Sequence, residues 1–131
     1  MPRILIAEDE PAISFGLELD LKTEGYDVEV VADGETAAQR GSSDAFDLIV
    51  LDLMLPKKDG FQVCAELKKD HTAKEIPIVA VFSGKGEQLD ADRCKQLGAA
   101  SYVSKGQGAA PLVAEIKTLL ANSGLTEPRN G

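Results

Sequence analysis

A chain of 131 residues that is 44% hydrophobic and 27% charged can bury a core of its own, which excludes a wholly disordered protein and one that needs disulfides to fold. Its net charge of −8 argues against direct binding to an anionic nucleic-acid backbone. Cys64 and Cys94 lack the spacing of a metal site, and neither a signal peptide nor a membrane span is visible, so we expect a cytoplasmic protein with two buried thiols and no membrane insertion.

Five short apolar segments are predicted to be β-strands, over residues 4–7, 28–31, 48–51, 78–82 and 102–103. The first, third and fourth are apolar at every position, which is typical of strands that helices cover on both faces of a parallel sheet. The second contains the charged residue Glu29, which favours a place nearer the edge of the sheet.

The first two helices are predicted between these strands. Ile13, Leu17 and Leu21 recur at four-residue intervals, and Gly25 follows where a C-terminal cap is expected. Asp33 can cap a second helix over residues 34–41.

Three further helices are predicted in the second half of the chain. Phe61, Cys64 (or Ala65) and Leu67 mark the third, and a weakly amphipathic fourth runs over 87–98 to Gly98. The fifth has an apolar stripe and a proline suited to its first turn: Leu112, Ile116, Leu119, Leu120 and Pro111. Repetition of a β-α unit five times predicts an α/β fold, a doubly wound parallel sheet, over residues 1–121, with a flexible tail or the start of a linker over 122–131.

Polar residues follow the C-terminal ends of four predicted strands: Glu8, Asp9 and Glu10; Asp52; Ser83, Gly84 and Lys85; and Ser104, Lys105 and Gly106. Right-handed crossovers place these strand ends at one edge of the sheet, so we expect the groups to converge. Crowded carboxylates need a compensating cation, and a small set of oxygen ligands favours Mg²⁺. A carboxylate nucleophile, a cation, a lysine and a hydroxyl together suit phosphoryl transfer.

Each of these groups also has an ordinary structural explanation. Glu10 before Pro11 is typical of a helix start, Ser83-Gly84 of a turn, and a lone lysine of a solvated surface. The agreement of four strand ends favours the functional interpretation.

Four segments resemble the receiver domain of bacterial two-component response regulators: ILIAEDE (4–10), DLIVLDLMLPKKDGF (47–61), IPIVAVFSGKG (76–86) and GAASYVSKG (98–106). The second is the most specific, because Asp52 is followed by Leu-Pro and Asp-Gly at the family's spacing. The resemblance runs from Ile4 to about Leu120. It implies a flavodoxin-like (βα)5 fold with strand order 2-1-3-4-5.

The resemblance also implies the roles of individual residues. Asp52 would accept a phosphoryl group from a phosphohistidine on a sensor histidine kinase or phosphotransfer protein. Asp9, Glu8 and the backbone carbonyl of Met54 would bind Mg²⁺ together with Asp52. Such a domain modifies itself and is not an enzyme that turns over a metabolite.

The remaining roles concern the response to the phosphoryl group. Ser83 and Lys105 would contact it, with Gly84 leaving room, and Tyr102 would follow as an aromatic switch. The change would remodel the face made by the fourth helix, the fifth strand and the fifth helix. Through that face the domain would control a downstream protein or output domain, or form a phosphorylation-dependent dimer.

Two positions depart from the family pattern. Gly106 stands after Lys105 where the family usually has proline, which bears on the placement of Lys105, and Ser83 replaces the commoner threonine. His71 is expected to be merely exposed, and Lys57 and Lys58 to be solvated loop charges.

Two other functions are compatible with parts of the sequence. A degenerate receiver could act as a phosphorylation-independent interaction module, which only the Lys105-Gly106 departure supports. An enzyme on the same fold is a poor fit: a flavodoxin would need a phosphate-binding loop where AEDEP stands, and a haloacid-dehalogenase-type phosphatase a second Asp at Met54. Whether the chain is a stand-alone regulator or part of a longer protein stays open.

Overall fold

A computed structural model of the protein describes residues 2–43, 46–71, 73–82, 87–104 and 109–122. Within them strands and helices alternate along the chain: β1 Arg3–Ala7, α1 Pro11–Thr23, β2 Asp27–Val31, α2 Gly34–Ser43, β3 Leu48–Asp52, α3 Gly60–Lys69, β4 Ile78–Phe82, α4 Glu87–Gln96, β5 Ser101–Ser104 and α5 Ala109–Asn122. The predicted alternation is confirmed. Asp52 is the last residue of its strand rather than the first residue after it.

The five strands form one parallel sheet with the order β2-β1-β3-β4-β5, as predicted. β2 is an edge strand, in agreement with the charge at Glu29, and β3 lies in the centre with every residue buried. A central strand has neighbours on both sides and helices on both faces, so it has no position for a solvated side chain. This explains the uninterrupted apolar run before Asp52.

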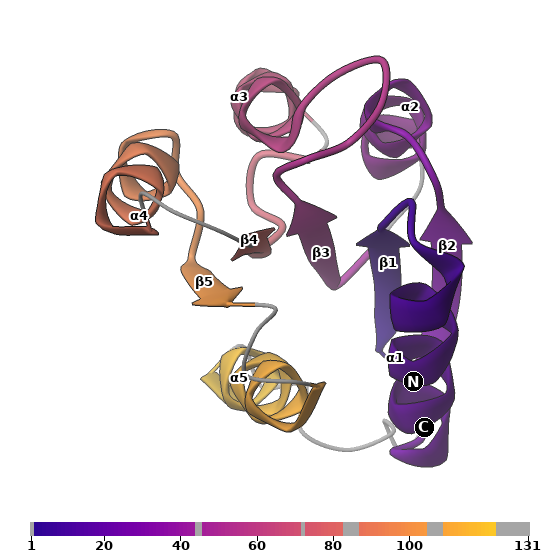
Figure 1. Ribbon diagram of the computed structural model, residues 1–131. Helices are drawn as coiled ribbons and strands as arrows, with labels where there is room; N and C mark the ends of the chain where they lie inside the picture. The colour runs from indigo at the N-terminus through magenta and orange to yellow at the C-terminus, as the bar shows by residue number, and fades with distance from the viewer. Residues whose placement is uncertain (1, 44–45, 72, 83–86, 105–108, 123–131) are drawn as a thin grey trace.

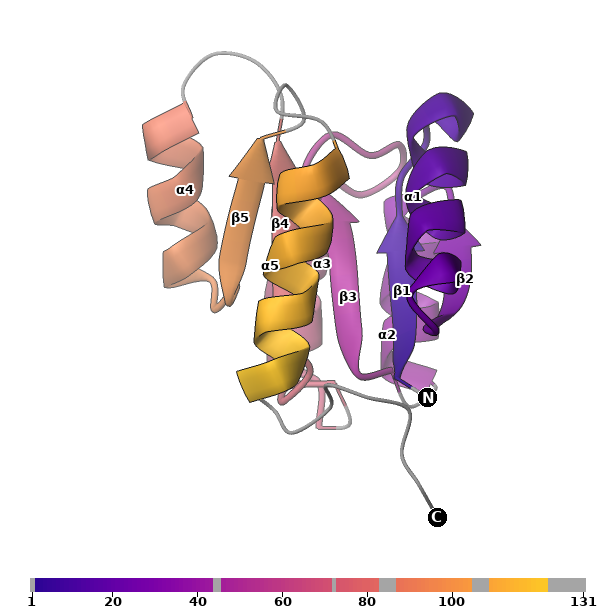
Figure 2. The same cartoon turned by 90° about the horizontal axis from the view of Figure 1, so that it is seen from below.

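Helices cover both faces of the sheet, with α2 and α3 on one face and α1 and α5 on the other, while α4 lies beside β5 (Figures 1 and 2). Alternate residues of each strand point to opposite faces. Accordingly, Leu5 and Leu51 pack in one hydrophobic cluster with residues of α2 and α3, and Ile6 and Val50 in another with residues of α1 and α5.

The predicted helix ends are confirmed where polar caps or glycine mark them. Gly25 follows α1 with φ of 93°, a left-handed conformation that glycine adopts without strain. Asp33 caps α2 by accepting the Thr36 N–H at 2.7 Å. At α3 the structure adds a detail that was not predicted: Asp59 and Gln62 form a reciprocal capping box.

Four smaller expectations have mixed outcomes. His71 is exposed and both cysteines are buried outside any disulfide, as expected. Lys58 is not simply solvated, because its Nζ donates to Glu66 Oε1 at 2.8 Å. α5 includes Asn122, the first residue of the expected tail, and residues 123–131 lie outside the described part of the chain.

A search of the described residues for a membrane-spanning helix finds none with the required length and hydropathy.

Replacing the α3 cap tests the contribution of the capping box. We expect Asp59→Ala to lower the free energy of unfolding by about 1 kcal/mol, because the Gln62 N–H loses its acceptor. Gln39→Ala, on the exposed side of α2, is the matched control and should change it by less than about 0.5 kcal/mol. Urea denaturation measures both. Equal stability of the two variants would contradict the assigned role of the cap.

Candidate functional site

Three carboxylates gather where the chain leaves β1. Oxygen atoms of Glu8, Asp9 and Glu10 lie within 4.8 Å of one another. Glu8 is buried, and its N–H donates to Val31 O at 3.0 Å, which extends the β1–β2 pairing by one residue. The other two acids are exposed. Several carboxylate oxygens close together, with that of Glu8 buried, are the type of ligand that Mg²⁺ and Ca²⁺ sites use.

Asp52 lies at the end of the central strand and is only 1% exposed. The Met54 N–H donates to its Oδ1 at 3.0 Å, and the Leu53 N–H continues the pairing with β4 by donating to Val81 O at 2.9 Å. The carboxylate is therefore attached to a rigid part of the sheet, and its rotation is fixed by a backbone donor. A buried carboxylate held in this way is preorganised for chemistry at the sheet edge.

The register of β1 and β3 relates Asp52 to the acidic cluster. Ala7 pairs with Leu51, so Glu8 and Asp52 are the next residues of two adjacent strands, whose backbones are about 4.8 Å apart. Among the described residues the group of three within 4.8 Å does not include Asp52. The structure thus brings Glu8 and Asp9 together as expected and places Asp52 beside them on the neighbouring strand.

Glu10 is among the polar residues expected at this sheet edge, but its place before Pro11 also predicts an ordinary helix-start role and it is not among the predicted metal ligands. It is the N-cap residue of α1, but its side chain makes no capping hydrogen bond. Instead its carboxylate belongs to the acidic cluster, and its N–H donates to Glu8 Oε1 at 3.3 Å. Its place directly after Glu8 and Asp9 was the signal available in the sequence.

The loop that leaves Asp52 folds back against the end of its own strand. The Gly60 N–H donates to Leu53 O at 3.0 Å, and a Cβ atom on Gly60 would lie 2.5 Å from the carbonyl oxygen of Asp52. No larger residue fits this approach without a shift of backbone. The Asp-Gly pair seen in the sequence therefore combines a helix cap with close contact to the strand.

The other predicted site residues have different outcomes. Ser83, Gly84 and Lys105 lie outside the described residues. Tyr102 lies on β5, paired with Ala80 of β4, and is 39% exposed. It lines a hollow of about 190 Å³ together with residues of α4 and the following turn.

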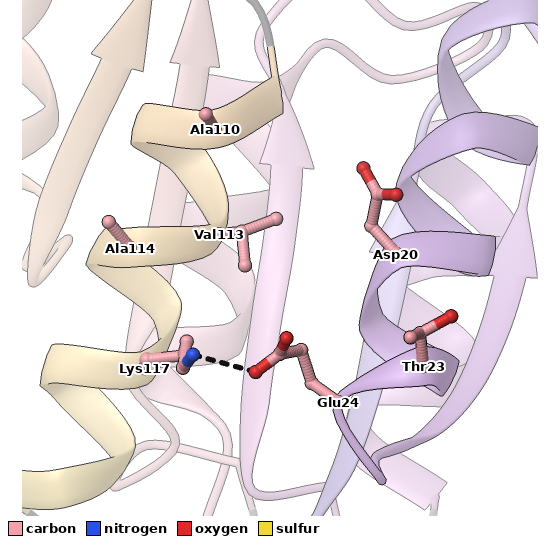
Figure 3. A pocket seen from close by; sticks show the side chains of 7 residues that line it. All are labelled: Asp20, Thr23, Glu24, Ala110, Val113, Ala114 and Lys117. Atoms are coloured by element: carbon pink, nitrogen blue, oxygen red, sulfur yellow. Dashed lines mark ion pairs between the residues drawn. The ribbon is translucent and has the colours of Figure 1, made fainter.

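A hollow lined by residues of α1 and α5 does not coincide with the acidic edge. It measures about 590 Å³, lies between α1 and α5, and is bordered by the ion pair of Lys117 Nζ with Glu24 Oε1 at 2.6 Å (Figure 3). None of the predicted site residues lines it. Its charged side chains, those of Asp20, Glu24 and Lys117, are all exposed. The acidic edge has the buried carboxylates of Glu8 and Asp52 and is therefore the better candidate site.

Comparison with known proteins gives a consistent result. The family model of the response regulator receiver domain matches residues 4–117. The DNA-binding dual master transcriptional regulator RpaA of Synechocystis is 38% identical over 120 residues, which cover 92% of this chain and 49% of that protein. The chain spans about half the length of the curated relatives it matches.

Two solved structures are similar over nearly the whole chain. The response regulator TrrA of Thermotoga maritima, in complex with Mg²⁺-BeF, is 31% identical with a TM-score of 0.80, covering 92% of this chain and all (100%) of that one. The receiver domain of the sensor histidine kinase PA1611 of Pseudomonas aeruginosa, with a magnesium ion in its active site cleft, is 29% identical with a TM-score of 0.81, covering 92% and 98%.

The cap of α2 gives a pH-dependent prediction. The Thr36 N–H, helped by the Thr36 hydroxyl and Lys57, holds the pKa of Asp33 below its usual value of 3.8. A carboxyl whose pKa is lowered by folding stabilises the folded state above its ordinary pKa, and this contribution is lost as the pH falls through the lower, folded value. We therefore expect the Thr36 amide to exchange faster with solvent only below about pH 4.

Asp33→Asn is the control, because asparagine caps a helix as well as aspartate but does not titrate. In this variant the hydrogen exchange rate of the Thr36 amide, corrected for its intrinsic pH dependence, should not rise over the same pH range. The same acid-induced change in this variant would show that another group is responsible.

Proposed function

The chain belongs to the response regulator receiver domain family, and we propose that it is a phosphorylation-dependent signalling switch with Asp52 as the phosphoacceptor. The observation that carries the proposal is the position of this carboxylate, buried at 1% exposure yet at the end of the central strand, next to the acidic residues that follow β1. A buried carboxylate is costly unless it has partners and a use. An ordinary packing position would hold an apolar residue.

We infer that Glu8, Asp9, Asp52 and the backbone carbonyl of Met54 hold Mg²⁺. The donor set fits the ion, because it consists of oxygen atoms only, and two of its carboxylates, those of Glu8 and Asp9, lie within 4.8 Å of each other and of Glu10 at the sheet edge. The similar structures of TrrA and the PA1611 receiver domain contain magnesium. When bound, the ion neutralises negative charge on the phosphoryl oxygens.

In the proposed reaction an oxygen of Asp52 attacks the phosphorus of a phosphohistidine on a sensor histidine kinase or phosphotransfer protein. The P–O bond forms as the P–N bond breaks, and the electron pair stays on the imidazole nitrogen. The Met54 N–H, 3.0 Å from Asp52 Oδ1, orients the carboxylate for this attack. By family resemblance Lys105 and Ser83 contact the phosphoryl group, with Gly84 leaving room.

The switch itself is proposed to involve Tyr102 and the α4–β5–α5 face. The ring is part-exposed beside a hollow of about 190 Å³, which leaves space for it to move. The buried side chains described on α4 are those of Ala91 and Cys94, and Cys94 lines the hollow beside Tyr102. The phosphoryl group would shift a two-state equilibrium of this face.

For the downstream partner we propose a class and not an individual protein. RpaA is named as a DNA-binding transcriptional regulator and PhoP of Bacillus subtilis as a transcriptional regulatory protein, and both are about twice as long as this chain. A downstream protein, an output domain or a second copy bound through the α4–β5–α5 face is consistent with the proposed switch.

Chemical phosphorylation tests the proposal. With acetyl phosphate and Mg²⁺ we expect the protein to gain one phosphoryl group that hydroxylamine removes, as an acyl phosphate requires, and Asp52→Asn to gain none. Asp47→Asn is the matched control, since this residue precedes the same strand at its opposite end. Intact-protein mass spectrometry measures all three. An unmodified wild type would overturn the assignment and favour the phosphorylation-independent interaction module.

The proposed output face has its own test. On phosphorylation we expect the backbone NMR shifts to change most in α4, β5 and the first turns of α5, beyond the residues next to Asp52, because the proposed switch residue Tyr102 lies on β5 and lines a hollow with Cys94 and Lys95 of α4. Tyr102→Ala should reduce these distant changes while phosphorylation of Asp52 continues. Distant changes confined to α1 and α2 would refute the assignment of the face.

A further inference from the structure

The loop over residues 53–59, here named the Met54 loop, is fixed at both ends by its own strand and helix. Leu53 pairs with β4 and Asp59 caps α3. Its centre is attached to a different part of the chain. The carbonyl oxygen of Pro56 accepts the Lys58 N–H at 2.8 Å and also the N–H of Gly34, the first residue of α2, at 3.0 Å.

The contact between α2 and the Met54 loop is unusually close. A Cβ atom on the buried Gly34 would overlap the carbonyl oxygen of Lys58. Lys57, between the two loop residues in contact, has φ of 70°, a left-handed conformation that costs energy for any residue but glycine. Its Nζ lies 4.0 Å from Asp33 Oδ2, beside the same contact. Such a conformation persists only where its surroundings impose it.

We propose that the start of α2 positions the Met54 loop for cation binding, with Gly34 as the positioning residue. The inference rests on the proposed Mg²⁺ site, in which the Met54 carbonyl is a ligand. Mg²⁺ demands near-ideal octahedral geometry, so a small displacement of one ligand weakens binding. Gly34 lies far from the acids in sequence, but its N–H holds the backbone two residues beyond Met54, at the carbonyl of Pro56.

Gly34→Ala tests this role against a matched glycine of the same helix. Gly41 is also buried in α2, but a Cβ atom there would meet the flexible Leu67 side chain, with Cδ2 at 2.8 Å, and not the Met54 loop. Alanine favours helix at both positions. We expect Gly34→Ala to bind Mg²⁺ about tenfold more weakly, the range typical for residues that support metal ligands, and Gly41→Ala to bind it as the wild type does.

Calorimetric titration with MgCl₂ gives the affinities, and urea denaturation without Mg²⁺ gives the stabilities. If both variants lose affinity for Mg²⁺, or if neither does, the inference is overturned while the proposed site stays intact. A wild type that binds no Mg²⁺ would overturn both.

A second measurement uses the wild type and does not depend on the folding of any variant. If the Gly34 contact favours Mg²⁺ binding, Mg²⁺ must favour the contact by the same factor. The Gly34 amide, which donates to Pro56 O, should therefore exchange with solvent about tenfold more slowly at saturating Mg²⁺. The Ala37 amide, bonded to Asp33 O in the same helix, is the internal reference. Equal slowing of both amides, or no slowing of Gly34, would refute the inference.

Discussion

The burial of one carboxylate, that of Asp52, is the constraint on which the rest of the structure depends. A charge removed from water must find compensation from hydrogen-bond donors, from a cation, or from both. Here the Met54 N–H supplies a donor, and the acids after β1 add the negative charge that the proposed Mg²⁺ would compensate. The apolar strand before Asp52 holds the carboxylate in place, because every residue of β3 is buried.

The backbone around this carboxylate is packed more closely than any side chain would allow. Gly60 lies against the carbonyl of Asp52, and Gly34 lies against the carbonyl of Lys58. Lys57, in the Met54 loop, takes a left-handed conformation. Close backbone contacts and local strain in the Met54 loop would hold the Met54 carbonyl in a fixed direction, as the proposed Mg²⁺ site requires.

The opposite arrangement is found at the β5 edge of the sheet. β5 has four residues, none of them buried. The described contacts of α4 include the small buried side chains of Ala91 and Cys94 and the guanidinium of Arg93, 3.9 Å above the ring of Phe61. The contrast has a physical basis, since stability follows the apolar area that each element buries. The proposed switch would thus combine a fully buried central strand with a part-exposed edge strand in one small domain.

The sequence by itself determined the strands, the helices, the parallel sheet and the acidic residues at its edge. Those features follow from local pattern: the continuous apolar run of 48–51, the spacing of Leu112, Ile116 and Leu120, and the caps Asp33 and Gly25. Only the tertiary structure decided that Glu10 joins the acidic cluster, that Lys58 pairs with Glu66, and that Gly34 contacts the Met54 loop. These depend on the approach of segments that are distant in sequence or on the rotation of single side chains, and neither leaves a periodic signal in the chain.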